Sequence, residues 1–265
     1  MSLNEKLITE SKMSLQALVA LCKRDIDAIR IPGYIEESVC AELSEKLFSY
    51  SDLKQYSMAP DINIKRTGMT LFETQYNNRF LQTYFGTAMS EKKSLAEQCY
   101  PNINPNELVQ ANLKRVWKYG AQVERIEGKQ CHYGTCRAFF EGQRLPPHVD
   151  YLPKDVKDYP QALWPQCQLA ANIYIKNPPK GGELNCWNDD INIENLHTIQ
   201  SGVYDFIKDD ILDAPVVSIK PKDGDLILIR SSDIHSVSPF SGSARAAFSF
   251  FINYRGRTKP LYFYV

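Results

Sequence analysis

Two histidines and one carboxylate in the second half of the chain have the types and spacing of a metal site. His148 and Asp150 stand two positions apart, so on an extended segment their side chains project to the same face. His235 comes shortly after an apolar run that ends at Arg230 and adds a second imidazole. Two neutral imidazoles and one carboxylate suit Fe(II) and leave three coordination positions open. The three residues therefore predict a non-haem iron centre.

An arginine ten residues beyond His235 supplies a group that these three residues lack. Arg245 precedes the run Ala246–Tyr254, whose apolar and aromatic composition is typical of a strand. A guanidinium group pairs with a carboxylate through two charge-assisted hydrogen bonds. We therefore expect Arg245 to hold one end of a dicarboxylic keto acid whose other end chelates the metal.

Three segments around these residues form motifs. Residues 137–151 read RAFFEGQRLPPHVDY, residues 235–245 read HSVSPFSGSAR, and residues 181–184 read GGEL. These segments resemble the R-Y-x-x-G-Q-x-Y-x-P-H-x-D, H-x-V-x-P-x-x-G-x-R and G-G-E-L motifs of the prolyl-4-hydroxylase-like Fe(II)/2-oxoglutarate oxygenases. The likeness covers about residues 131 to 257. It implies a double-stranded β-helix (jelly-roll) core in which His148, Asp150 and His235 hold iron and Arg245 holds the C5 carboxylate of 2-oxoglutarate.

One position departs from the family pattern. The family's tyrosine before the P-H-x-D motif, which helps to hold 2-oxoglutarate, is Leu145 here. Three polar residues are candidates to replace that contact, namely Arg137, Asn172 and Tyr174. Asn172 and Tyr174 alternate onto one face of the strand expected at Gln168–Ile175.

Residues 67–75, TGMTLFETQ, and residues 181–188, GGELNCWN, resemble a small-molecule branch of this superfamily. That branch contains carrier-independent halogenases and hydroxylases of free or N-substituted amino acids. Its halogenases replace the metal carboxylate with Gly or Ala, whereas Asp150 is present in this chain. The resemblance therefore implies hydroxylation of an unactivated C–H bond, with Fe(II), 2-oxoglutarate and dioxygen required and succinate and CO2 released.

The expected substrate is a small molecule, either an amino acid or an amine. An aromatic side chain followed by carboxylates, as in Trp187-Asn188-Asp189-Asp190, suits a cationic amine. The candidate substrate contacts are Glu73, Tyr151, Trp187 and Asn188. Two alternatives stay open at this point: a protein or peptidyl-prolyl hydroxylase, which would need an open groove for an extended chain, and a catalytically silent jelly roll that binds a small ligand.

The composition excludes some partners. The 265 residues contain 31 Lys and Arg against 31 Asp and Glu, so no excess of positive charge favours nucleic acid or an anionic membrane. The apolar run Ala17–Cys22 is far shorter than the ~20 residues of a membrane span, and charged residues interrupt the N-terminal segment where a secretory signal would stand. We expect a cytoplasmic protein whose seven cysteines are reduced thiols. The sequence leaves its oligomeric state open.

The order of the elements predicts one domain, residues 1–265, that is mainly β with a helical N-terminal layer. Residues 1–130 form the mainly helical support and residues 131–257 the β-helix core with the metal site. Helical spacing and start signals predict helices over Glu5–Ile29, from Ser38 onward, over Asn77–Met89 and over Asn106–Tyr119. Short apolar runs between turn signals predict strands over Ala138–Phe140, Gln168–Ile175, Glu183–Trp187, Val216–Ile219, Leu226–Ile229 and Ala247–Tyr254.

Overall fold

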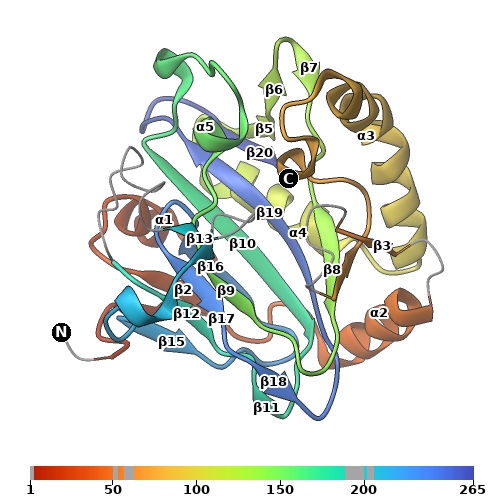
Figure 1. Ribbon diagram of the computed structural model, residues 1–265, viewed down its shortest axis with the longest axis vertical. Helices are drawn as coiled ribbons and strands as arrows, with labels where there is room; N and C mark the ends of the chain where they lie inside the picture. Colours follow the sequence, from red (N-terminus) through yellow and green to blue (C-terminus); the bar gives the residue numbers. More distant parts are fainter. Residues whose placement is uncertain (1–2, 50–52, 57–62, 189–199, 202–205) are drawn as a thin grey trace.

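Two facing β-sheets dominate the structure (Figure 1). The computed structural model describes residues 3–49, 53–56, 63–188, 200–201 and 206–265. The strands of the large sheet are β1 (Leu7–Thr9), β2 (Ala28–Ile31), β3 (Lys54–Gln55), β4 (Ile64–Arg66), β5 (Ala121–Val123), β8 (Thr135–Phe139), β10 (Cys167–Lys176), β16 (Leu226–Arg230), β19 (Arg245–Tyr254) and β20 (Leu261–Tyr264). They run in the order β1-β2-β16-β10-β19-β8-β4-β3, and β20 joins β19 to β5.

The small sheet carries the metal-binding motifs. Its strands are β9 (Leu145–His148), β12 (Leu184–Cys186), β15 (Val217–Ile219) and β17 (His235–Val237), in the order β15-β12-β17-β9. Together with β8, β10, β16 and β19 of the large sheet, these strands form a double-stranded β-helix. Among the described residues, three short pairs complete the strands: β6 (Arg125–Ile126) with β7 (Lys129–Gln130), β11 (Lys180–Gly181) with β18 (Phe240–Ser241), and β13 (Gln200–Ser201) with β14 (Phe206–Ile207).

Alternation along β10 explains how the large sheet separates its two faces. Leu169, Ala171 and Ile173 belong to the apolar cluster beneath the helices, whereas Ala170 and Tyr174 belong to the cluster between the sheets. Successive side chains of a strand point to opposite faces, and both faces of this strand are covered. A strand that is buried on both faces can carry a nearly continuous apolar run, which is what the sequence of β10 shows.

Helices cover the outer face of the large sheet. The long helices are α1 (Leu15–Cys22), α2 (Glu37–Ser49), α3 (Asn78–Cys99) and α4 (Pro105–Val116). The short α5 (Leu152–Asp155) and the 3-10 turns η1 (Leu71–Thr74), η2 (Gln161–Leu163) and η4 (Asp209–Ile211) are not part of this layer, and Leu152 and Leu71 belong to the cluster between the sheets. Buried residues of α1, α2 and α4 share one apolar cluster with β10, β16 and β19. In Figure 1, α4 is seen behind the sheet and α3 at its edge. This packing holds the inner face, and the side chains on it, in place.

The N-terminal segment differs from the prediction of one helix over Glu5–Ile29. Strand β1 pairs in parallel with β2, and only α1 between them is helical. The Ser14 hydroxyl caps the start of α1, and Arg24 adopts a positive φ of 65° just after its end. Residues 1–130 thus contribute four helices but also strands β1 to β5 to the large sheet. Apolar spacing alone could not show this, because a short buried strand and a helical turn give similar patterns.

The other predicted helices form, with different limits. α2 begins at Glu37, one residue before Ser38, where the sequence predicts the helix to start. α3 begins after the capping side chain of Asn77, as expected, but continues to Cys99. α4 starts at Pro105 behind the Asn104 cap. The capping residues Asn77 and Asn104 thus mark where α3 and α4 start, whereas apolar spacing does not show that α3 continues to Cys99.

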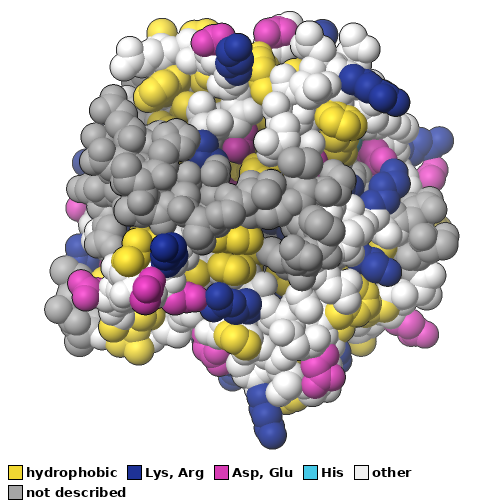
Figure 2. Space-filling model, viewed as in Figure 1, with side chains coloured by type: hydrophobic (Ala, Val, Ile, Leu, Met, Phe, Trp, Pro, Cys, Tyr) yellow, Lys and Arg dark blue, Asp and Glu magenta, His cyan; other side chains and the backbone are white. Residues whose placement is uncertain are grey.

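Surface features agree with the charge balance of the sequence. Figure 2 shows acidic and basic side chains interspersed over the described part of one face. Of the helices in the described ranges, none has the length and apolar character needed to cross a bilayer. All seven cysteines are free thiols.

Candidate metal centre and adjoining cavities

The structure brings His148, Asp150 and His235 together. Strands β9 and β17 are antiparallel neighbours in which His148 stands opposite His235, and Asp150 follows two residues after β9. The candidate ligand atoms all lie within 4.8 Å of one another. Asp150 Oδ2 is 3.6 Å from Nε2 of His148 and 3.4 Å from Nε2 of His235. One carboxylate oxygen and two imidazole nitrogens therefore converge on one point.

Backbone carbonyls orient both imidazole rings. Nδ1 of His148 donates to the Pro146 carbonyl at 2.8 Å, and Nδ1 of His235 donates to the Asp233 carbonyl at 3.0 Å. A ring whose Nδ1 carries the proton keeps the lone pair on Nε2, which is the atom that faces Asp150. In both cases the carbonyl belongs to the residue two positions before the histidine, so a short local hydrogen bond fixes the orientation of the ring.

The electrostatics of the three residues suit a divalent cation. Burial and the neighbouring His235 lower the pKa of His148, which favours the neutral ring that a metal requires. Burial by itself would raise the pKa of Asp150, but His148 and His235 outweigh it and hold that pKa well below its ordinary value. Two neutral imidazoles and one carboxylate are the donor set that fits Fe(II).

Arg245 lies at the far end of a small cavity between the two sheets. The cavity reaches from the three metal-binding candidates to Arg245, which is 3% exposed. Nε and Nη1 of this guanidinium group have no hydrogen-bond partner among the described residues. Its carbon lies 5.1 Å from the ring centroid of Tyr174 and 5.5 Å from that of Phe139. A buried cation with two idle donors is costly unless an anion accepts from them, so this end of the cavity fits a carboxylate.

Asn172 and Tyr174 line the same cavity, so the face of β10 that carries them does look inward. Burial raises the pKa of Tyr174 despite the nearby Arg245, which keeps its hydroxyl protonated as a donor. Ser249 of β19 also lines the cavity, and its buried hydroxyl has no partner within the described part of the chain. Three polar side chains thus line the space between the metal-binding candidates and Arg245.

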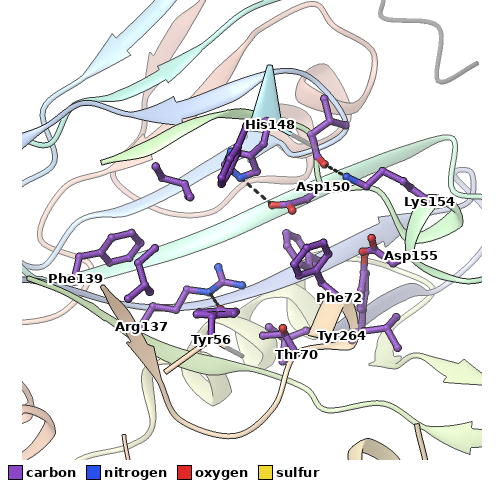
Figure 3. Close-up of a pocket in the computed structure, with 17 residues that line it drawn as sticks. Tyr56, Thr70, Phe72, Arg137, Phe139, His148, Asp150, Lys154, Asp155 and Tyr264 are labelled. Atoms are coloured by element: carbon purple, nitrogen blue, oxygen red, sulfur yellow. Dashed lines mark hydrogen bonds and ion pairs between the residues drawn. The ribbon is translucent and has the colours of Figure 1, made fainter. Parts of the chain in front are cut away.

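A second, larger cavity opens on the other side of His148 and Asp150 (Figure 3). In Figure 3, His148 and Asp150 lie along one wall, and Arg137 and Tyr56 face them from the other. The remaining walls are mostly apolar and aromatic, with Lys154 and Asp155 at one side; they include Ile64, Leu71, Phe72, Phe139, Leu145, Val149, Phe206, Phe251 and Tyr264. A small molecule in this cavity would lie beside the metal centre.

Arg137 lines both cavities. Its Nε donates to the Tyr56 hydroxyl at 2.8 Å, and its guanidinium carbon lies 6.0 Å from the ring centroid of Phe251. Tyr56 and the negative charge of Asp150 keep the pKa of Arg137 raised although burial acts to lower it. Arg137 is therefore a fixed positive charge at the junction of the two spaces.

The structure does not bring Glu73 or Tyr151 to either cavity. The Glu73 carboxylate is 1% exposed, forms an ion pair with Arg66 and accepts from the backbone and hydroxyl groups of Thr70. The Tyr151 hydroxyl donates to the Pro165 carbonyl at 3.0 Å. Both side chains are bound to local structure and border neither cavity, whereas the sequence led us to expect substrate contacts from them.

Trp187 and Asn188 are also directed elsewhere. Nε1 of Trp187 donates to the Asp213 carbonyl at 2.7 Å. The Asn188 amide oxygen accepts from Arg24 and Arg230, at 3.2 and 3.3 Å. Within the described residues, Trp187 and Asn188 border neither of the two cavities beside the metal-binding candidates. Asp189 and Asp190 lie outside the described residues.

Some cavity residues were missed by sequence reasoning. The position of Ser249 could have been predicted, because it lies four residues after Arg245 on the same strand and its side chain therefore points to the same face. No sequence pattern marks Tyr56 or Phe206 as cavity residues, since each comes from a distant segment that only the fold places at the cavity. Gln168, the second residue of β10, lines neither cavity, and the sequence shows it only as the first residue of a predicted strand.

Comparison with known proteins bears on this site. Residues 133–253 match the family model described as the 2OG-Fe(II) oxygenase superfamily. A curated L-gamma-glutamyl-L-propargylglycine hydroxylase from Streptantibioticus cattleyicolor is 27% identical over 153 residues. That match covers 56% of this chain and 54% of the relative, so the chain spans about half the length of the relative it matches.

The fold has close counterparts among solved structures. An N-substituted L-amino acid dioxygenase from Burkholderia ambifaria AMMD superimposes with a TM-score of 0.63 at 17% identity, covering 94% of this chain and 91% of that one. Its complex with alpha-KG gives a TM-score of 0.62 at 16% identity, covering 94% and 90%. At such identities the likeness establishes the shared fold.

Fold and site together define a double-stranded β-helix protein in which two histidines and one aspartate could hold a metal ion. The family match narrows this class further. Residues 133–253, a little under half of the chain, are similar to the 2OG-Fe(II) oxygenase superfamily.

Proposed function

We propose that the protein is a 2-oxoglutarate-dependent hydroxylase of a small molecule, acting on an unactivated C–H bond and releasing succinate and CO2. One observation carries this proposal: a single cavity has the three metal-binding candidates at one end and a buried arginine with two idle donors at the other. A dicarboxylic keto acid fits between these ends. The family match and the curated hydroxylase relative support the same reaction.

Each residue has a distinct part in the reaction. His148, Asp150 and His235 would hold Fe(II), which together with 2-oxoglutarate and dioxygen supplies the oxidising power for C–H cleavage. Arg245, Tyr174 and Asn172 would orient the co-substrate by its C5 end. The apolar walls of the larger cavity would hold the substrate against the metal centre and exclude water from it.

Arg137 supports a carboxylate-bearing substrate such as an amino acid derivative. Arg245 borders only the small cavity, whereas Arg137 also faces the larger one. Its Nε is bound to Tyr56, so the planar guanidinium group is held in one orientation for an anion in the cavity. The names of the relatives, a hydroxylase of a γ-glutamyl amino acid and a dioxygenase of N-substituted amino acids, support the same class.

We also propose that residues 1–265 act as one oxygenase domain. Support comes from β2, which pairs with β16 of the core, and from α2, which packs on β10. Residues 1–130 would then serve as the layer that holds residues 131–257 in place.

The proposal is tested by a succinate-release screen with the purified protein, Fe(II) and 2-oxoglutarate. Amino acids, N-acyl amino acids and small amines are supplied, each acid beside its primary amide. Substrate-stimulated succinate is expected with acids and not with their amides, and Arg137→Met should raise KM for the acid while leaving 2-oxoglutarate affinity within about twofold. Preference for amines or amides would contradict the substrate class, and no stimulated succinate with any compound would count against the hydroxylase.

A further inference from the structure

Gln168 is a fully buried residue whose side-chain amide contacts the segment that contains Asp150 and the segment that leads to His235. Its Nε2 donates to the Asp150 carbonyl at 2.9 Å and to the Ser231 hydroxyl at 3.1 Å. Its Oε1 accepts from the Leu152 amide at 2.8 Å and from the Tyr264 hydroxyl at 3.0 Å. The side chain is 0% exposed, so water does not compete for these bonds.

The four hydrogen bonds use the whole capacity of a carboxamide. An amide group has two N–H donors and an oxygen with two lone pairs, and each has one partner here. The partners also fix which way the group points, because the Leu152 N–H can only donate and the Asp150 carbonyl can only accept. Rotating the amide by 180° would break both bonds, so Gln168 has one stable orientation.

Gln168 therefore links the two segments that carry the metal-binding candidates. Its contacts with Asp150 and Leu152 enclose the peptide units on either side of Tyr151 and so fix the backbone from which the Asp150 carboxylate projects. Its contact with Ser231 holds the start of the turn that leads to His235. The Asp150 amide closes the link by donating to the Ser231 carbonyl at 2.8 Å, and the Ser231 amide donates to the Gln168 carbonyl at 2.9 Å.

We propose that Gln168 is a positioning residue for the metal centre, which sets the spacing between Asp150 and His235 through this hydrogen-bond link. The inference rests on the proposed metal site, but it concerns a residue that contacts no ligand atom. Residues that orient metal ligands change metal affinity by about 10- to 100-fold when they are replaced. An apolar side chain at position 168 would leave the Asp150 carbonyl, the Leu152 N–H and the Ser231 hydroxyl without their Gln168 partner, and both segments would shift to find others.

The test uses Co(II) as the probe, because its visible absorption reports both affinity and coordination geometry. Wild-type protein, Gln168→Met and Gln110→Met are titrated with Co(II) in the absence of oxygen, and their thermal unfolding is measured alongside. Gln110 is a matched control: it is 7% exposed, its Nε2 donates to the Tyr133 carbonyl at 2.8 Å, and it lines neither cavity. The same chemical change is thus made at a buried, hydrogen-bonded glutamine outside the link between Asp150 and Ser231.

We expect Gln168→Met to raise the Co(II) dissociation constant by about 10-fold or more and to change the shape of the spectrum at saturation. Gln110→Met should lose stability yet keep the wild-type affinity and spectrum. Wild-type affinity and spectrum in Gln168→Met would overturn the proposal.

A second variant keeps the test decisive if Gln168→Met does not fold. Ser231→Ala removes a single acceptor of the Gln168 amide and should weaken Co(II) binding by about fivefold, as expected for one lost hydrogen bond. Unchanged affinity and spectrum in Ser231→Ala would then overturn the link. A different result would show that the proposed metal site itself is wrong: His235→Ala would then bind Co(II) as tightly as the wild-type protein does.

Discussion

Replacing Arg245 with leucine should separate co-substrate binding from metal binding. The guanidinium group is 3% exposed and has two nitrogens without partners among the described residues. Each charge-assisted hydrogen bond to a carboxylate contributes about 1.5 to 3 kcal/mol, so two of them contribute about 3 to 6 kcal/mol. Since 1.4 kcal/mol is a factor of ten, the dissociation constant of 2-oxoglutarate should rise by roughly a hundredfold to ten-thousandfold.

The assay is an anaerobic titration of the Fe(II) protein with 2-oxoglutarate, followed by visible absorption. Fe(II) affinity should stay close to wild type, because Arg245 is not among the residues that would hold the metal. Arg245→Lys keeps the charge but loses the planar fork, so its affinity should fall between those of the wild-type and leucine proteins. Arg255→Leu is the matched control, because Arg255 forms an ion pair with Glu124 at 2.8 Å and borders neither cavity.

Stability gives an independent check on the same substitution. In the ligand-free protein Arg245 is a buried cation with idle donors, so its removal should leave the unfolding free energy unchanged or increase it. A leucine variant with wild-type 2-oxoglutarate affinity would refute the assignment. A variant that lost affinity only in proportion to a loss of stability would show that Arg245 supports the fold instead.

Three further results are expected. Asp150→Gly should abolish hydroxylation and weaken Fe(II) binding at least tenfold by calorimetry; hydroxylation at the wild-type rate without added carboxylate would rule out Asp150 as a ligand. Glu73→Gln breaks a buried ion pair with Arg66 and should lower the unfolding free energy by about 3 to 5 kcal/mol in urea melts, while the folded variant binds 2-oxoglutarate as the wild type does; a specific loss of 2-oxoglutarate or substrate binding would place Glu73 in the active site. Adding Ni(II) at about 100 times its dissociation constant should stabilise the protein by about 2.7 kcal/mol, and a chelator should reverse this; an unchanged melting temperature would argue against a metal site in the folded protein.

The sequence predicted correctly those features that depend on residues close together in the chain. Asn77 and Pro105 mark helix starts through capping and a fixed φ, and the structure has helices at both. The alternation that places Asn172 and Tyr174 on one face follows from strand geometry, and both line the small cavity. His148 and His235 stand opposite each other because β9 and β17 pair, which the spacing of the motifs does not show.

The features that were missed depend on contacts between distant segments. Glu73 looked like a charge near the site, but its partner Arg66 satisfies it in a buried ion pair. Trp187 looked like an aromatic floor, but its indole is turned toward the Asp213 carbonyl. The four partners of Gln168 come from three parts of the chain. No local pattern marks such a residue, because its role exists only after the sheets have packed.

The most direct test of the metal and co-substrate site is an anaerobic absorption spectrum of the protein with Fe(II) and 2-oxoglutarate. Chelation of a keto acid to ferrous iron held by His148, Asp150 and His235 should produce a weak visible band that neither component gives alone. The band should be absent in His235→Ala under the same conditions. If the wild-type protein gives no band, or if His235→Ala gives the same band as the wild type, the three residues do not form the iron centre.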